Sequence, residues 1–197
     1  VFLSGQVGEK EIELVNQFLG QQKVVESILE LPSRDIIPQT EPLWLEKEGA
    51  VQSSIRVGRK LFKRQHPDFY RMIVANEILG GYFGSRLMKN IREDKGFTYG
   101  ISASMVPMRQ EGYWVIGTDV KKEFAQATLD EIQKEITTLQ NELVPADELE
   151  VVKNYMAGEF AGSLNTPFEI ADRVRLMVLE GLDVDFYSNY IQRLRVV

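Results

Sequence analysis

Short stretches in which apolar residues alternate with polar ones, or which are simply apolar, predict strands in this chain. The predicted strands cover 1–5, 51–57, 98–105 and 112–118. Only six residues, 106–111, separate the last two, and 107–111 are expected to form a hairpin loop. Residues 31–44 contain three prolines and are expected to cross the molecule in an extended conformation.

Longer stretches repeat their apolar residues every three or four positions, which predicts amphipathic helices. These helices cover 9–19, 67–79, 125–143, 145–160, 166–180 and 186–194. A further short helix is predicted between Ser85, as its N-cap, and Gly96. Thr166 and Glu169 have the spacing of a capping box, with a proline at the first helical position between them.

Strands grouped near the middle of the chain and helices grouped toward its end favour an α+β fold, with helices on one face of a mostly antiparallel sheet in two layers. The chain has 197 residues, 44% of them hydrophobic, which suits one domain spanning 1–197. It starts at Val1 without a methionine, in a predicted strand. We therefore expect the C-terminal fragment of a larger protein.

Charge and composition narrow the classes of partner. The 23 basic and 29 acidic residues give a net charge of −6, which disfavours nucleic acid. The basic stretch 56–64 is typical of a solvated strand edge, although a polyanion-binding surface is the alternative. No apolar run approaches the ~20 residues of a membrane span, so we expect a soluble protein. Either the cytoplasm or the periplasm fits, and the compartment stays open.

Candidate catalytic groups are few. The chain has no cysteine and a single histidine, His66, which precedes Pro67 at a helix start and is interpreted as a surface or capping residue. A zinc site needs about three protein ligands, so no metal or other cofactor is expected in this chain. The loop 80–85 is glycine-rich but lacks the lysine of a phosphate-binding loop. We interpret it as a turn between two helices.

Arg92 and Tyr99 allow two accounts. In the first, Arg92 is a charge that interacts with the end of its helix, and Tyr99 is a core residue, because it shares its strand parity with Ile101 and Ala103. In the second, the helix end and the strand start converge and present a guanidinium and a phenol together. Both groups are suitable hydrogen-bond donors to a peptide carboxylate or carbonyl.

The stretch ILGGYFGSRLMKNIREDKGFTYGISASM, with GYWVIGTDVKKEFAQATLDEIQKEI and ADELEVVKNYMAGEF after it, resembles the pitrilysin/insulinase-type zinc metallopeptidases. That family includes the mitochondrial processing peptidase and its bacterial relatives. The resemblance covers nearly the whole chain. Its most specific part is L-x-x-x-I-R-E-x-x-G-x-x-Y, from Leu87 to Tyr99.

The resemblance implies a repeated α+β architecture in which one half carries the zinc motif H-x-x-E-H and the other half binds substrate without zinc. This chain has no H-x-x-E-H, so it resembles the non-catalytic half. The expected partners are a catalytic domain or subunit, which holds the zinc, and a peptide or protein substrate. Arg92 and Tyr99 match the family's substrate-contacting pair. The alternatives are a structural, core-subunit-like homologue that binds no peptide, and a homodimer of this fragment.

Overall fold

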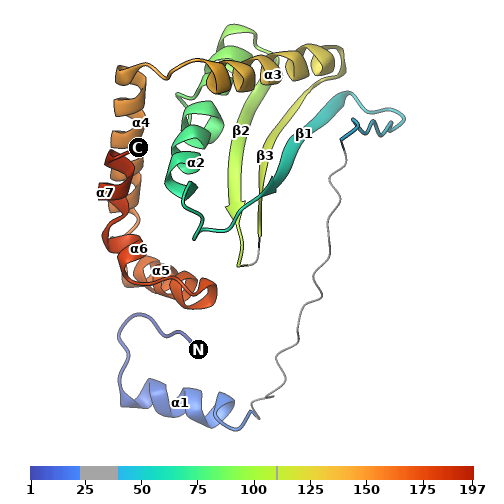
Figure 1. The fold of residues 1–197 in the computed structure, drawn as a ribbon. Coiled ribbons are helices and arrows are strands. Elements are labelled where there is room, and N and C mark those ends of the chain that lie inside the picture. Colours follow the sequence, from blue (N-terminus) through green and yellow to red (C-terminus); the bar gives the residue numbers. More distant parts are fainter. Residues whose placement is uncertain (23–39, 110) are drawn as a thin grey trace.

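The computed structural model describes residues 1–22, 40–109 and 111–197. Within these ranges the strands are β1 (Gln52–Leu61), β2 (Thr98–Pro107) and β3 (Gly112–Lys121). They form an antiparallel sheet in the order β1-β3-β2 (Figure 1). The alternating pattern thus predicted all three strands, and each continues for a few residues beyond its predicted end.

Helices make up most of the remaining described chain, and the predicted α+β class is confirmed. The α-helices are α1 (Glu9–Leu19), α2 (Phe69–Asn76), α3 (Ala125–Asn141), α4 (Ala146–Gly162), α5 (Pro167–Glu180), α6 (Asp185–Ser188) and α7 (Tyr190–Arg195). Two π-helical segments, η1 (Glu77–Gly81) and η2 (Met88–Asp94), and a 3₁₀ turn, η3 (Lys122–Phe124), complete the list.

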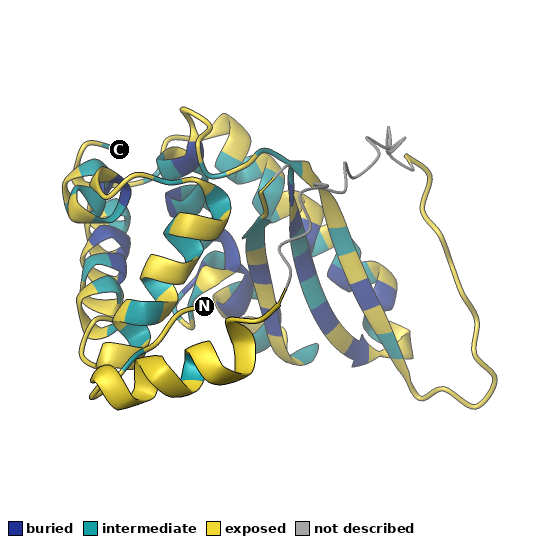
Figure 2. Ribbon diagram, turned by 90° about the horizontal axis from the view of Figure 1, so that it is seen from below, coloured by how far each residue is buried: buried dark blue, intermediate teal, exposed yellow. Residues whose placement is uncertain are grey.

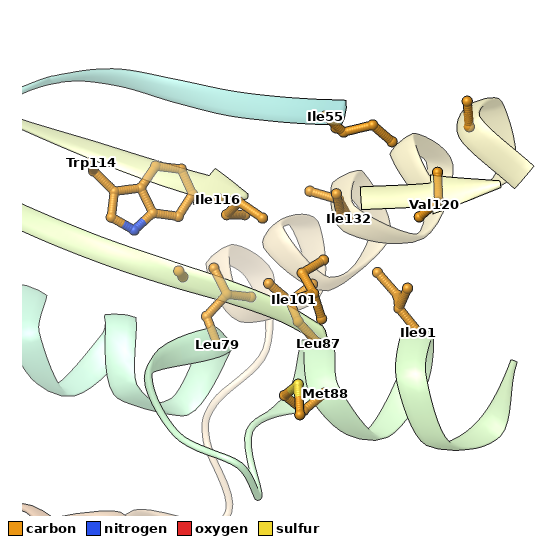
Figure 3. Packing of buried hydrophobic residues seen from close by; sticks show 12 residues of the cluster. Ile55, Leu79, Leu87, Met88, Ile91, Ile101, Trp114, Ile116, Val120 and Ile132 are labelled. Atoms are coloured by element: carbon orange, nitrogen blue, oxygen red, sulfur yellow. The ribbon is translucent and has the colours of Figure 1, made fainter. Parts of the chain in front are cut away.

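One face of the sheet packs against α3, η1 and η2 and forms the main core (Figure 3). Ile116, at the centre of β3, is fully buried between Leu87 and Ile91 from the helices and Ile132 from α3. Burying one such side chain contributes about 1.5–3 kcal/mol, so this face provides much of the stability of the domain.

A second apolar cluster lies on the far side of α2. It joins Val74 and Ile78 to Val152 and Met156 of α4 and to Leu194 of α7. None of its buried residues comes from a strand. The helices α4 and α7 pack on α2 and η1, which they cover from outside (Figure 1).

The opposite face of the sheet is open and lined by small or polar residues. Gly100, Ser102 and Ser104 of β2 are exposed there, beside Gly117 and Asp119 of β3. The alternation of buried and exposed residues along the strands is visible in Figure 2. A shallow hollow of about 290 Å³ lies over these residues.

The N-terminal predictions were only partly right. Residues 1–5 are not a strand: Ser4 Oγ donates a hydrogen bond to the carbonyl oxygen of Pro167 at the start of α5 (2.6 Å), and Gly5 has a φ of +106°, which ends any extended run. Helix α1 has the predicted bounds, but none of its residues is buried, and Phe18 is 72% exposed. Residues 31–39 of the predicted extended segment lie outside the described residues.

Several helix ends also differ from the prediction. The helix expected over 67–79 changes to π-helical geometry at Glu77, and the one expected over 186–194 is broken at Asn189. Ser85 is not a side-chain cap: it is 1% exposed, and its hydroxyl has no hydrogen-bond partner among the described residues. Its backbone N–H instead closes a turn onto the carbonyl oxygen of Tyr82 (3.1 Å).

Candidate functional site

The glycine-rich loop after η1 is shaped by close packing. A Cβ atom on Gly80 would lie 2.7 Å from the backbone nitrogen of Ala103, so glycine lets η1 approach β2. A Cβ on Gly84 would lie 2.8 Å from the ring of Tyr82. The loop is therefore a tight turn, as the sequence indicated, and its glycines allow close packing against other residues of the chain.

This loop sends its two aromatic side chains in different directions. Tyr82 packs on Tyr155 of α4 with ring centroids 5.0 Å apart, and burial raises the pKa of its phenol, with smaller contributions from Glu148 and Glu77. Phe83 is 62% exposed, and its ring faces the guanidinium of Arg92. Tyr82 thus packs into the helical layer, while Phe83 forms one side of an exposed site.

Segment η2, which carries Arg92 in its last turn, is fastened to α3. Asn90 Nδ2 donates to Glu131 Oε2 (2.9 Å) and Glu135 Oε1 (2.6 Å), and Lys95 Nζ lies 3.1 Å from Glu131 Oε1. The hydrogen bond from Asn90 is the main cause of a lowered pKa at Glu131. These contacts fix the side of η2 that faces α3 and leave Arg92 on the side toward the start of β2.

A β-bulge at the start of β2 turns Tyr99 out of the core. Thr98 pairs with Val120 and Ile101 pairs with Thr118, so Tyr99 and Gly100 together stand opposite one residue of β3. Regular alternation would have placed Tyr99 on the buried face with Ile101. Instead its side chain is 94% exposed, and the interpretation of Tyr99 as a core residue is wrong.

Two threonine hydroxyls hold the bulge in place. Thr98 Oγ1 accepts a hydrogen bond from the N–H of Gly100 (3.1 Å) and donates to the carbonyl oxygen of Asp119 (2.8 Å). The hydroxyl of Thr118, which is 4% exposed, lies 2.8 Å from Thr98 Oγ1 and 2.9 Å from the carbonyl oxygen of Gly100. Backbone groups that lose their regular ladder partners at the bulge thus find side-chain partners.

The bulge brings Arg92, Phe83 and Tyr99 together. Arg92 Nε donates to the backbone carbonyl oxygen of Tyr99 (2.9 Å), and its guanidinium carbon lies 4.6 Å from the Phe83 ring centroid and 5.9 Å from that of Tyr99. Among the described residues, the terminal nitrogens of Arg92 and the hydroxyl of Tyr99 have no hydrogen-bond partner. The second account of the pair, a convergence of helix end and strand start, therefore agrees with the geometry.

We call Phe83, Arg92 and Tyr99 the Arg–Tyr cluster. It presents an oriented guanidinium and a phenol, both donors that suit a carbonyl or carboxylate oxygen. It contains no nucleophile with an adjacent base, which covalent catalysis requires. Its groups are hydrogen-bond donors. Sequence reasoning missed Phe83, although an aromatic residue in a glycine-rich turn was a usable signal.

The other candidate residues have structural partners. His66 stacks on Phe62 with ring centroids 4.0 Å apart, and its Nδ1 accepts a hydrogen bond from the N–H of Asp68 (3.1 Å); its side chain is exposed, as expected of a surface residue before α2. In the described parts of the chain, no three histidine, cysteine, aspartate or glutamate side chains are grouped as metal ligands. No helix in those parts is long and apolar enough to cross a membrane.

Comparison with known proteins gives a consistent result. Residues 1–156 match the family model described as Peptidase M16 inactive domain. Over 166 residues the chain is 27% identical to the uncharacterized zinc protease YmxG of Bacillus subtilis, which covers 84% of this chain and 40% of that protein.

Solved structures are also similar in fold. The M16 inactive domain from Pseudomonas fluorescens is 26% identical, with a TM-score of 0.69 over 75% of this chain and 35% of that one. A protease from Helicobacter pylori has a TM-score of 0.81 at 18% identity, over 98% of this chain and 48% of its own. This chain thus spans less than half the length of each of these three proteins.

Proposed function

The chain belongs to the Peptidase M16 inactive domain family, and on that basis we propose that it is the non-catalytic, peptide-binding half of a zinc metalloendopeptidase. In this proposal a separate H-x-x-E-H domain or subunit performs the cleavage. Arg92 and Tyr99 contact the substrate peptide. The similarity to a protein named as a zinc protease supports the class of reaction.

The Arg–Tyr cluster is the observation that carries the proposal. Its guanidinium is held by one hydrogen bond to a backbone carbonyl and by the face of Phe83, while its terminal nitrogens stay free to donate. A hydrogen bond to a charged group contributes about 1.5–3 kcal/mol. A group oriented in advance loses little side-chain entropy when a ligand arrives.

The position of the cluster on the sheet also suits a peptide. Within the described residues, β2 is an edge strand of the sheet, and Tyr99 stands at its start. An extended peptide can add to such an edge through backbone hydrogen bonds while side chains provide selectivity. Arg92 and Tyr99 would then fix the peptide at one end of that edge.

Zinc belongs to the other half of the proposed enzyme. With one histidine, this chain cannot supply the two histidines of H-x-x-E-H. Zinc in such a motif polarises a peptide carbonyl and activates water. The contribution of this chain is to bind and orient the peptide and, on closure over it, to exclude water.

Exposed apolar residues offer a surface that the catalytic half could cover. Helix α5 has no buried residue, and Phe168 and Val178 are 66% and 63% exposed. Phe18 of α1 is similarly exposed. Such apolar surface fits an interface. Without the catalytic half, the same surface offers a contact between two copies, which light scattering of the isolated chain would detect as a dimer.

The test uses the chain together with its H-x-x-E-H partner, fused or coexpressed. Arg92→Ala should lower kcat/KM for a peptide substrate about tenfold or more, and Tyr99→Phe less, because only the hydroxyl is removed. Arg71→Ala and Tyr113→Phe, at exposed positions outside the cluster, are the matched controls. Unchanged kinetics in both cluster variants would favour the structural, core-subunit-like alternative.

A further inference from the structure

A cavity of about 1010 Å³ lies on the helical side of the sheet, where the end of β1 meets α2 and the second half of α3. None of the residues of the Arg–Tyr cluster lines it. Its volume is at the upper end of the range in which small-molecule sites are found. It is therefore a separate candidate site.

The walls of the cavity are mainly apolar. Six apolar side chains that belong to the main core, or pack against it, face the space: Leu61, Met72, Leu79, Trp114, Ile136 and Leu139. The amide of Asn76 also lines it, but both ends are engaged: its Oδ1 accepts from Trp114 Nε1 (2.9 Å), and its Nδ2 donates to the carbonyl oxygen of Ala103 (3.2 Å). The interior therefore favours a hydrocarbon chain.

Within the part of the chain that the structure describes, Arg59 and Lys63 at the cavity wall have no partner. Arg59 lies on the inward face of β1 with Ile55 and Val57, directly opposite the buried Trp114, yet it is exposed. In the described residues neither Arg59 nor Lys63 has an ion-pair or hydrogen-bond partner. Their neighbours differ: Lys60 pairs with Glu111, and Arg64 pairs with Glu180 at 2.7 Å. An inward arginine beside an apolar space is unusual in a strand.

We propose that this cavity binds an amphipathic carboxylate, a linear alkyl chain with one acidic headgroup. The alkyl chain occupies the apolar space beside Trp114, and the carboxylate lies between Arg59 and Lys63. The planar guanidinium can bind a carboxylate through two parallel hydrogen bonds. The basic stretch 56–64, whose sequence is typical of a solvated edge, thus divides into paired residues and an anion-binding pair.

Tryptophan fluorescence tests this directly. The chain has two tryptophans, Trp44 and Trp114, and Trp44 is 62% exposed outside the cavity, so Trp44→Phe leaves Trp114 as the reporter. We expect saturable fluorescence changes with octanoate, decanoate and dodecanoate below their critical micelle concentrations. Each added methylene should tighten binding about threefold to fourfold until the cavity is filled.

The headgroup contacts are tested by Arg59→Gln with Lys63→Gln, both at surface positions where folding should not suffer. Each exposed charge contact contributes about threefold, so dodecanoate should bind about tenfold more weakly. The matched control is Lys121→Gln with Lys122→Gln, the same charge change at the opposite end of the sheet. Dodecanol should bind the unaltered chain as weakly as dodecanoate binds the double variant.

The cavity itself is tested by Ala75→Phe, which fills it from α2. Circular dichroism and a melting curve establish that this variant is folded, and its Trp114 response should disappear. The proposal is overturned if Trp114 shows no saturable change or if dodecanol binds as tightly as dodecanoate. Retained binding by the folded Ala75→Phe variant would overturn the assignment to this cavity.

Discussion

The hydroxyl of Thr98 should determine where Tyr99 points, and Thr98→Val tests this. The hydroxyl connects both sides of the bulge, through Gly100 on β2 and Asp119 on β3, and contacts the buried Thr118. Valine has nearly the same shape but neither donates nor accepts a hydrogen bond. The substitution therefore removes the hydrogen bonds of the Thr98 hydroxyl and changes little else.

The expected cost follows from the groups that lose partners. One intramolecular hydrogen bond contributes about 0.5–1.5 kcal/mol net, and a buried group left without a partner costs about 1–3 kcal/mol. Thr98 is half-buried, so water can replace part of what is lost. We expect a loss of about 2 kcal/mol in the free energy of unfolding, which lowers Tm by roughly 4–8 °C in a chain of this size.

Two assays follow the effect. Urea unfolding gives the free energy. Nitration by tetranitromethane, with the modified tyrosines located by mass spectrometry, reports exposure of the phenol. Tyr99, at 94% exposed, should be nitrated faster than Tyr113, at 44%, in the unaltered chain. In Thr98→Val the nitration rates of Tyr99 and Tyr113 should become more similar. Without the hydrogen bonds of the Thr98 hydroxyl, the strand can return to the regular alternation that places the Tyr99 side chain inward.

Thr128→Val is the matched control. Thr128 is 0% exposed, and its hydroxyl has no hydrogen-bond partner in the described part of the chain. The same substitution there should be neutral or stabilising, since it removes a buried polar group. Equal losses of stability at the two positions, with unchanged nitration of Tyr99, would refute the hypothesis that the Thr98 hydroxyl determines the direction of Tyr99.

Three further outcomes are expected. Phe83→Leu removes the aromatic face 4.6 Å from Arg92 and should weaken peptide binding measured by calorimetry about twofold to fivefold, without changing Tm. Burial, with a smaller contribution from Glu159, raises the pKa of Glu77 from 4.5 to about 7. Ionisation of the Glu77 carboxyl opposes folding. The contribution of the protonated side chain to the free energy of unfolding is therefore complete below pH 4.5 and is lost as the pH rises through 7. Glu77→Gln should accordingly stabilise the chain at pH 8 and not at pH 4, by about 1 kcal/mol once screening of this partly exposed group is allowed for. Thr166→Ala removes the side-chain cap on Glu169 N–H (3.2 Å) and should cost about 1 kcal/mol in urea unfolding, whereas Ser188→Ala, outside any cap, should cost less.

Features that depend on neighbours in the sequence were predictable. The capping box forms as expected: Thr166 Oγ1 accepts from Glu169 N–H, and the Glu169 carboxylate accepts from Thr166 N–H (2.8 Å). Gly181 ends that helix with a φ of +67°. In each case the deciding atoms are within a few residues of each other, so local sequence contains the information.

The orientation of Tyr99 depended on distant residues and was not predictable in this way. Its bulge is held by Thr118 and Asp119, about twenty residues away on another strand. The parity rule assumes a regular strand and gave the wrong face. Phe83 was missed for a similar reason, because its role comes from contact with Arg92 of a different element.

The error at the N-terminus has a different origin. A strand requires another strand to pair with, and an amphipathic helix requires a surface that covers its apolar face. The local pattern of apolar residues does not say which other segment provides either one. The apolar residues of 1–5 predicted a strand, while the structure ties Ser4 to the start of α5. The apolar residues spaced along 9–19 correctly predicted helix α1, but the structure leaves the apolar face of this helix largely exposed.

The π-helical geometry of η2 has a consequence for how this site tolerates changes in chain length. Hydrogen bonds that skip one residue more than in an α-helix accommodate an extra residue in the turn. Deletion of Lys89, an exposed residue of η2, would let the segment relax to an α-helix and keep it helical. The residues after the deletion would rotate by roughly 100° about the helix axis relative to those before it. Arg92 would then leave the ring of Phe83, so the extra residue sets the direction of the guanidinium.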